Sequence, residues 1–402
     1  MIVMRKKLFF LSLLLLGGIT LMAQQNHTHA QKEKSVYQRI TNLETKSNRF
    51  NLFLNMNGSF DAEWNNKNSD YNFGHFNMRQ LRIEAKGNIN ERFSYRWRQR
   101  LNRPNNPGVD NMPTSIDIAG LGVNITDRFS MFAGKQCAAY GGIEFDLNPI
   151  EIYEYSDMIE NMSNFLTGVN FAYQLSPNHQ LQFQILNSLN HGFSSTYNTS
   201  YDPRIYGAKI PLVYTLNWNG NMFDGAFQTR WSASVMSQTS KKHMFYMAFG
   251  NQLNLSKNFD MFVDVMYSRE DLDRKGIISR LLPIQAPDRS IYTAQNANYL
   301  SFVAKANIRF APRWNWFIKG MYETASVGKD FTIERRFIEK GKFSTSLGYF
   351  TGIEYYPMSN SNLHFFLTYV GRSFKYEKKL DYMKDFNTNR VSLGFIYQLP
   401  MF

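Results

Sequence analysis

The stretch FSYRWRQR, residues 93–100, alternates arginine with bulky aromatic side chains. Successive side chains of a β-strand point to opposite faces, so this alternation predicts a strand with two different faces. One face carries Ser94, Arg96, Arg98 and Arg100, and the other carries Phe93, Tyr95, Trp97 and Leu101. A single strand of this kind fits a soluble sandwich as well as a barrel, and the rest of the chain decides between them.

The same period of two continues from residue 49 to the end of the chain and predicts sixteen strands. Most are longer than the five or six residues typical of globular strands and match the roughly ten tilted residues that cross a bilayer. The expected strands are 49–61, 75–87, 93–101, 115–125, 129–136, 165–175, 180–189, 208–218, 225–237, 243–255, 259–270, 297–310, 314–327, 345–356, 363–375 and 389–402.

The links between these strands alternate in length. Short links such as NINER (88–92), TDR (126–128), SKN (256–258) and APR (311–313) alternate with long polar links. The long ones are 102–114, 137–164, 190–207, 271–296, 328–344 and 376–388. Tight periplasmic turns and long external loops are typical of outer-membrane barrels. We therefore predict an all-β, transmembrane antiparallel barrel over residues 49–402, in contact with outer-membrane lipid.

The first residues have the pattern of a cleaved signal peptide. Three basic residues (5–7) precede an apolar run at 8–16, and small residues lead to an expected cleavage after Ala23. A transmembrane anchor would need about 20 apolar residues, and this run is shorter. No cysteine lies near the cleavage site, which excludes a lipoprotein anchor. Residues 1–23 are the predicted signal peptide. Residues 24–48 are polar and are expected to be a periplasmic segment, either disordered or a short helix.

Composition excludes several other classes of protein. The chain has one cysteine, Cys137, which excludes an internal disulfide framework and multi-cysteine metal sites. The formal net charge of +13 would suggest nucleic acid as a partner in the cytoplasm, but an exported chain rarely meets any. We expect localisation in the bacterial outer membrane and no cofactor, metal or nucleic acid.

A barrel of sixteen strands leaves a water-filled lumen. Arginines about 7 Å apart along one strand offer an anion successive binding positions, and charge along a pore selects ions by sign. The alternative is that these arginines pair with inward carboxylates such as Glu84 and only stabilise the wall. The basic residues expected to face the lumen are Arg82, Lys86, Arg96, Arg98, Arg100, Arg230, Lys305 and Arg309.

Loop 137–164 is long and carries both acidic and apolar side chains, but no lysine or arginine. Its apolar side chains would be costly to leave in water, so we expect the loop to fold into the lumen and narrow it. The alternative is an external loop packed against its neighbours. An inward loop would set acids opposite the basic wall and favour polar solutes over strong anion selectivity. These constriction-loop acids are Glu144, Asp146, Glu151, Glu154 and Asp157.

Two segments resemble the phosphate-selective porin O and P family. They are MFAGKQCAAYGGIEFDLNPIEIYEYSD (131–157), with its GKQ, YGG and P-x-x-x-Y-x-Y-S features, and RQLRIEAKGNINERFSYRWRQRL (79–101). The resemblance implies a homotrimeric, sixteen-stranded outer-membrane porin with loops folded into the lumen. It also implies that the three arginines at 96, 98 and 100 belong to an arginine ladder, and that Lys135 is a basic residue near the constriction.

We therefore expect passive diffusion of small polar or anionic solutes, with phosphate as one candidate. The alternative is a structural or adhesive barrel closed by its loops. A barrel enzyme is less expected, because catalysis by a serine needs an adjacent base. The nearest approach is Ser188 and His191 in NSLNHGFSS.

Overall fold

The computed structural model describes residues 47–67, 73–197, 205–282, 291–359 and 361–401. The chain divides into two units, residues 1–33 and 34–402, and all described residues belong to the second. The predicted signal peptide (1–23) and nearly all of the predicted periplasmic segment (24–48) lie outside the described residues.

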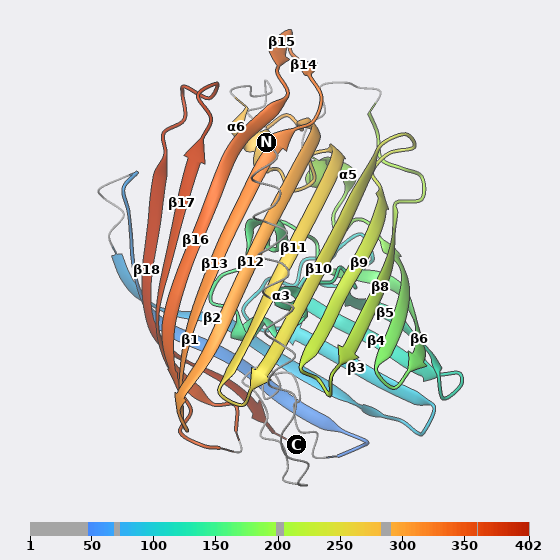
Figure 1. Ribbon diagram of the computed structural model, residues 1–402. Coiled ribbons are helices and arrows are strands. Elements are labelled where there is room, and N and C mark those ends of the chain that lie inside the picture. Colours follow the sequence, from blue (N-terminus) through green and yellow to red (C-terminus); the bar gives the residue numbers. More distant parts are fainter. Residues whose placement is uncertain (1–46, 68–72, 198–204, 283–290, 360, 402) are drawn as a thin grey trace. The chain divides into compact units, whose positions relative to one another are not determined.

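In the described part of the chain, sixteen strands form one closed barrel in which every neighbouring pair is antiparallel (Figure 1). Sequential strands are neighbours, and β1 pairs with β18 to close the ring, with Phe60 opposite Leu393. The barrel strands are β1 Asn51–Asn65, β2 Phe73–Asn88, β3 Phe93–Arg100, β4 Ile116–Asn124, β5 Phe129–Cys137, β6 Phe165–Ser176, β7 His179–Asn187, β8 Leu212–Met222, β9 Phe227–Ser237, β10 His243–Ser256, β11 Phe259–Leu272, β12 Gln295–Ala311, β13 Trp314–Val327, β16 Gly341–Tyr355, β17 His364–Tyr376 and β18 Phe386–Pro400.

This architecture confirms the predicted fold class, and every expected strand is present within a few residues of its expected bounds. The alternation of short and long links also holds. The link 238–242 is short, as the expected strand bounds implied, although it lies at the end of the barrel that carries the long loops. One detail was not predicted. The long link after β13 contains a further hairpin, β14 Phe331–Ile333 and β15 Arg336–Ile338.

Strand β13 shows how the sequence fixes the two faces of the wall. Trp314, Trp316 and Ile318 are 42%, 40% and 49% exposed on the outer face, whereas the alternating residues 315, 317, 319, 321 and 323 are buried. The buried set includes Asn315, Lys319 and Glu323, so the polar side of the strand faces inward. This arrangement is the reverse of a soluble sandwich and fits apolar lipid outside and water inside. Among the described residues, no helix is long and apolar enough to span a membrane.

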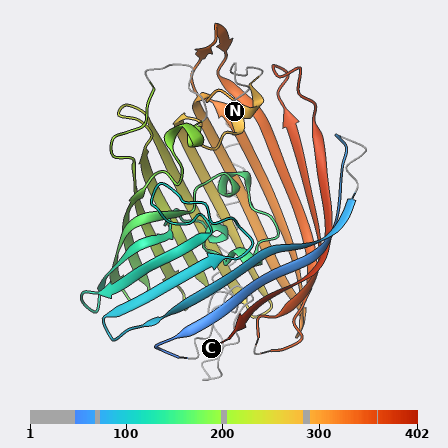
Figure 2. The ribbon, with the colours of Figure 1, turned by 180° about the vertical axis from the view of Figure 1, so that it is seen from behind.

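The loop between β5 and β6 folds into the barrel, as predicted, and forms three short helical turns (Figure 2). They are α3 Ile143–Asp146, η1 Pro149–Glu151 and α4 Asp157–Glu160. The chain turns inward at Gly141 and Gly142, whose φ angles of 72° and 90° favour glycine. Ile143 and Ile150 have no exposed surface, so these side chains form an apolar core inside the barrel. Two other long links contain the helices α5 Phe193–Tyr197 and α6 Ile277–Leu281.

Candidate functional site

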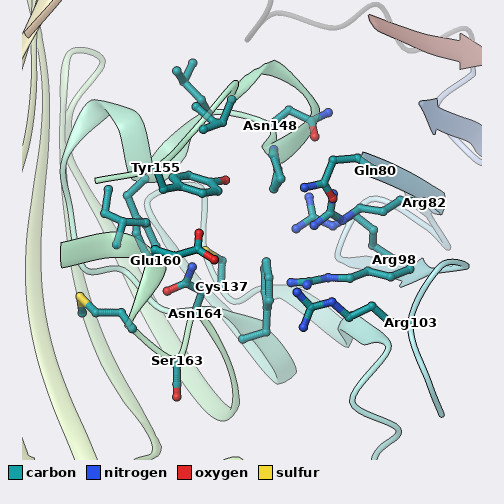
Figure 3. A pocket seen from close by; sticks show the side chains of 18 of the residues that line it. Gln80, Arg82, Arg98, Arg103, Cys137, Asn148, Tyr155, Glu160, Ser163 and Asn164 are labelled. Carbon is teal, nitrogen blue, oxygen red and sulfur yellow. The ribbon is translucent and has the colours of Figure 1, made fainter. Parts of the chain in front are cut away.

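A cavity of about 1240 Å³ lies between strands β2–β4 and the inward loop. Figure 3 shows Arg82, Arg98 and Arg103 on one side of it, pointing toward Tyr155 and Glu160 of the loop. Basic side chains outnumber acidic ones among its lining residues, so the cavity offers anions a favourable environment. The basic lining residues are Arg79, Arg82, Lys86, Arg96, Arg98, Arg100, Arg103, Lys135 and Arg372, and the acidic ones are Glu84, Asp146, Glu154, Asp157 and Glu160.

Three arginines of this wall share one carboxylate, that of Asp117. The Nε atoms of Arg82, Arg98 and Arg100 lie 2.9, 3.3 and 2.7 Å from its oxygens. Asp117 is 1% exposed, so water screens these charges little. Since one carboxylate balances one guanidinium, two of the three positive charges in this arginine cluster have no counter-charge from Asp117.

Arg96 is bound by a second carboxylate, and an aromatic ring also contacts Arg98 and Arg100. Arg96 Nε lies 2.9 Å from Glu84 Oε1, as the structural alternative for these arginines required, yet the Arg96 side chain remains 43% exposed. The guanidinium carbons of Arg98 and Arg100 lie 5.2 and 5.5 Å from the centre of the Phe165 ring. Such cation–π contacts hold a guanidinium in place without neutralising it.

The acids of the inward loop pair with cations on other strands of the wall. Glu154 lies 2.9 Å from Arg390 and Asp157 lies 2.8 Å from Arg372. Glu144, which is fully buried, binds Lys319. Asp146 lies 2.9 Å from Arg230, and Glu151 lies 3.8 Å from His364. These acids therefore anchor the loop, and the charges of the four that pair with lysine or arginine are balanced before they can oppose the arginine cluster across the cavity.

Two carboxylates of the wall bind the backbone of the loop directly. Asp264 on β11 accepts hydrogen bonds of 2.8 Å from the backbone N–H groups of Ile143 and Glu144, at the start of α3. Glu323 on β13 accepts 2.9 and 3.1 Å hydrogen bonds from the N–H groups of Asp157 and Met158, at the start of α4. Each carboxylate satisfies N–H groups that a helix leaves free at its first turn. The loop is therefore fixed at both of its α-helical turns.

The predicted basic residues separate into two groups. Arg82, Lys86, Arg96, Arg98, Arg100 and Lys135 line the cavity, although Lys135 also pairs with Asp110 at 3.6 Å. Arg230, Lys305 and Arg309 do not line it. The inward loop packs over Arg230 through Asp146, and Lys305 lies between Tyr153 of the loop and Phe317 of the wall. Arg309 lies near the short turn between β10 and β11, where its backbone N–H donates to the backbone oxygen of Asn258.

Sequence reasoning missed Asp117 for a specific reason. Strict alternation puts it on the same face as Ala119 and Leu121, which is the lipid face. The pairing of β3 with β4 shifts by one residue at this point, since Arg98 is opposite Ile118 and Gln99 is opposite Ile116. The resulting bulge lets the Asp117 side chain turn inward. The only signal in the sequence was an isolated acid in an apolar strand.

The described strands form a closed barrel of sixteen strands with a polar interior. An inward loop, held to the wall by its acids, narrows this interior beside a basic wall. These features define a porin of the outer membrane. The chain belongs to the phosphate-selective porin O and P family, whose sequence profile matches residues 50–399. It is therefore an outer-membrane channel for small solutes, and its family and fold are those of channels rather than enzymes.

Solved structures with a similar fold are also outer-membrane channels. The channel DcaP of Acinetobacter baumannii has a TM-score of 0.58 at 11% identity, covering 89% of this chain and 99% of that chain. An anion-selective porin from Comamonas acidovorans has a TM-score of 0.53 at 6% identity, covering 87% and 99%. Salmonella typhi OmpF, in complex with daunomycin, has a TM-score of 0.53 at 13% identity, covering 89% and 99%. No curated protein matches the sequence.

Proposed function

We propose that this channel passes small anions in preference to cations, with phosphate as a candidate solute. The observation that supports the proposal is that Arg82, Arg98 and Arg100 share the single carboxylate of Asp117. The cavity beside them therefore keeps an excess of positive charge. Four of the loop acids, Glu144, Asp146, Glu154 and Asp157, reduce this excess little, because each is paired with a lysine or arginine of the wall. The family description and the anion-selective porin among the similar structures agree with this charge preference.

The test is the reversal potential of the purified channel in a planar bilayer with a salt gradient. Replacing Arg96, Arg98 and Arg100 by Ser should move the reversal potential toward cation preference. The shift should be larger at low salt, because 0.1 M salt screens charge over about 10 Å. Arg309→Ser is the matched control, since it removes an arginine that does not line the cavity. An unchanged reversal potential in the triple variant would show that the arginines serve only the stability of the wall.

Phosphate needs its own measurement. Adding phosphate to the unmodified channel in chloride should block the chloride current at sub-millimolar concentration if the site binds phosphate as a specific ligand. Absence of block, with anion preference intact, would leave a general anion channel. Absence of any conductance would favour the alternative of a structural or adhesive barrel closed by its loops.

We also propose that the channel is a homotrimer exported through cleavage after Ala23. Membership of the family supports the trimer, and the basic, apolar and small-residue order of residues 1–23 supports the cleavage. Light scattering in mild detergent should give the mass of three chains, and a monomeric mass would contradict the trimer. N-terminal sequencing of the membrane protein should begin at Gln24.

We propose no catalytic activity for the barrel. Ser188 donates its hydroxyl hydrogen to the backbone oxygen of Ser237, an arrangement that does not prepare it as a nucleophile. Lipase and protease assays on the folded protein should show no turnover.

A further inference from the structure

A second cavity, of about 490 Å³, adjoins the first. The lining residues common to both cavities are Lys86, Arg96, Ile118 and Cys137. We call this group of four side chains the neck. They come from four consecutive strands, β2 to β5, so the neck lies against the same wall as the arginine cluster.

The two cavities extend toward opposite ends of the barrel. The smaller one is lined by Ser47 and Asn48 before β1 and by Gly87 and Asn88 beside the short turn 89–92. The larger one reaches Asn102, Arg103 and Gly108 in the long link 101–115. A solute that moves from the side of the long loops to the side of the short turns, along these cavities, therefore passes the neck.

The neck has one basic side and one apolar side. Lys86 and Arg96 are opposite each other on β2 and β3. Glu84, which also lines the larger cavity, binds Arg96, and the centre of the Phe53 ring lies 5.2 Å from Lys86 Nζ. Ile118 and Cys137 supply the other side, and Ile118 is only 3% exposed. An ion at this point meets the cations of Lys86 and Arg96, of which, among the described residues, only Arg96 is paired with a carboxylate, that of Glu84. The Ile118 and Cys137 side offers it no hydrogen bond from a side-chain hydroxyl or amide.

We propose that the neck is the part of the channel that determines which solutes pass. Lys86 and Arg96 set the sign of the permeating ion there, and Ile118 and Cys137 limit its size. This inference rests on the proposed anion preference and assigns it to particular residues. Arg98 and Arg100 contribute less than Arg96 at this point, because their side chains are 7% and 17% exposed, compared with 43% for Arg96.

The first test places a negative charge in the neck. Ile118→Glu should lower single-channel conductance in chloride several-fold and move the reversal potential toward cations, whereas Ile118→Gln should stay near wild type. Gln228→Glu is the matched control, because residue 228 pairs with Gln252 on the inner face of the wall but lines neither cavity. If the two glutamate variants behave alike, the neck is not the selective step. Folding of each variant is checked by its heat-dependent migration on gels.

The second test uses the native thiol and needs no mutation in the channel that is probed. A negatively charged methanethiosulfonate reagent reacts with the Cys137 thiolate, which attacks the sulfenyl sulfur, forms a mixed disulfide and releases methanesulfinate. Mass spectrometry should show one added group, and the conductance should fall at least twofold, while Cys137→Ser should be insensitive. A labelled channel with unchanged conductance would overturn the proposal.

The two proposals can fail separately. If the triple arginine variant loses anion preference but the neck tests are negative, the anion preference stands and its assignment to the neck is wrong. If the triple variant keeps wild-type preference, the anion preference itself is wrong. Comparing Arg96→Gln with Arg100→Gln ranks the two arginines directly by the shift in reversal potential. Arg96→Gln should shift it more, and equal shifts would contradict the special role of the neck.

Discussion

Asp117 on β4 accepts a 2.9 Å hydrogen bond from Arg82 on β2, and the two side chains are 1% and 2% exposed. The bond joins strands that are not neighbours, since β3 lies between them and contributes Arg98 and Arg100 to the same carboxylate. One buried acid thus holds together a cluster of three like charges. The positive charge available to solutes and the stability of the wall both depend on this acid.

Asp117→Asn should make the channel more anion-selective and less stable. The amide removes the one negative charge among three guanidiniums, and loss of one partner of a buried ion pair typically costs about 3–5 kcal/mol. Reversal potentials and unfolding in denaturant would measure the two effects. Asp117→Glu keeps the charge and should stay closer to wild type in both. Reduced anion preference in the asparagine variant would contradict the assigned role.

The strands could be predicted from the sequence because lipid and water impose an alternation that persists over ten or more residues. The inward loop could be predicted because residues such as Ile143 and Ile150 would be costly in water. The partners of the loop's acids could not be predicted in this way. Glu144 binds Lys319 and Glu154 binds Arg390 from far along the chain, and periodicity carries no information about such distant pairs. Asp117 was hidden by a bulge that reverses the alternation.

Lys319→Met should loosen the inward loop without unfolding the barrel. Lys319 binds the buried Glu144 carboxylate and also donates to the backbone oxygen of Glu154 at 2.7 Å, so its loss leaves an unpaired buried charge. Single-channel recordings should show more open-channel noise, and added protease should cut within 138–164. Lys342→Met is the control, since Lys342 pairs with Glu377 at the surface, where the two side chains are 46% and 40% exposed. Equal noise in both variants would count against this anchor.

Gly371→Ala should destabilise the barrel, because the Tyr349 ring on the neighbouring strand lies across Gly371. A Cβ atom there would come within 2.1 Å of the ring. Moving the ring should cost about 1–3 kcal/mol and lower the temperature at which the folded form disappears on gels. Gly320→Ala is the control, since a Cβ atom there meets nothing within 4 Å. A Gly371→Ala variant as stable as the Gly320→Ala variant would show that the Tyr349 ring moves at little cost.

Glu160, at the end of α4, should give the channel a pH-dependent charge preference. It lines the large cavity, and Figure 3 shows it on the loop side, opposite Arg98 and Arg103. Partial desolvation raises the pKa of its carboxyl, and the Glu154 carboxylate raises it further, while Arg103 and Arg100 lower it. Asp157, which also raises it, is paired with Arg372.

The sign of the effect follows from the charge of Glu160. Above its raised pKa the side chain is negative and opposes anion entry, and below that pKa it is neutral. Anion preference, measured as the reversal potential at fixed salt, should therefore increase as the pH falls through this pKa. Glu160→Gln should show the higher preference at every pH and lose the step. Glu154→Gln should instead loosen the loop, because its carboxylate is bound to Arg390. A step of unchanged size in the Glu160→Gln channel would assign the titration to another acid of the cavity.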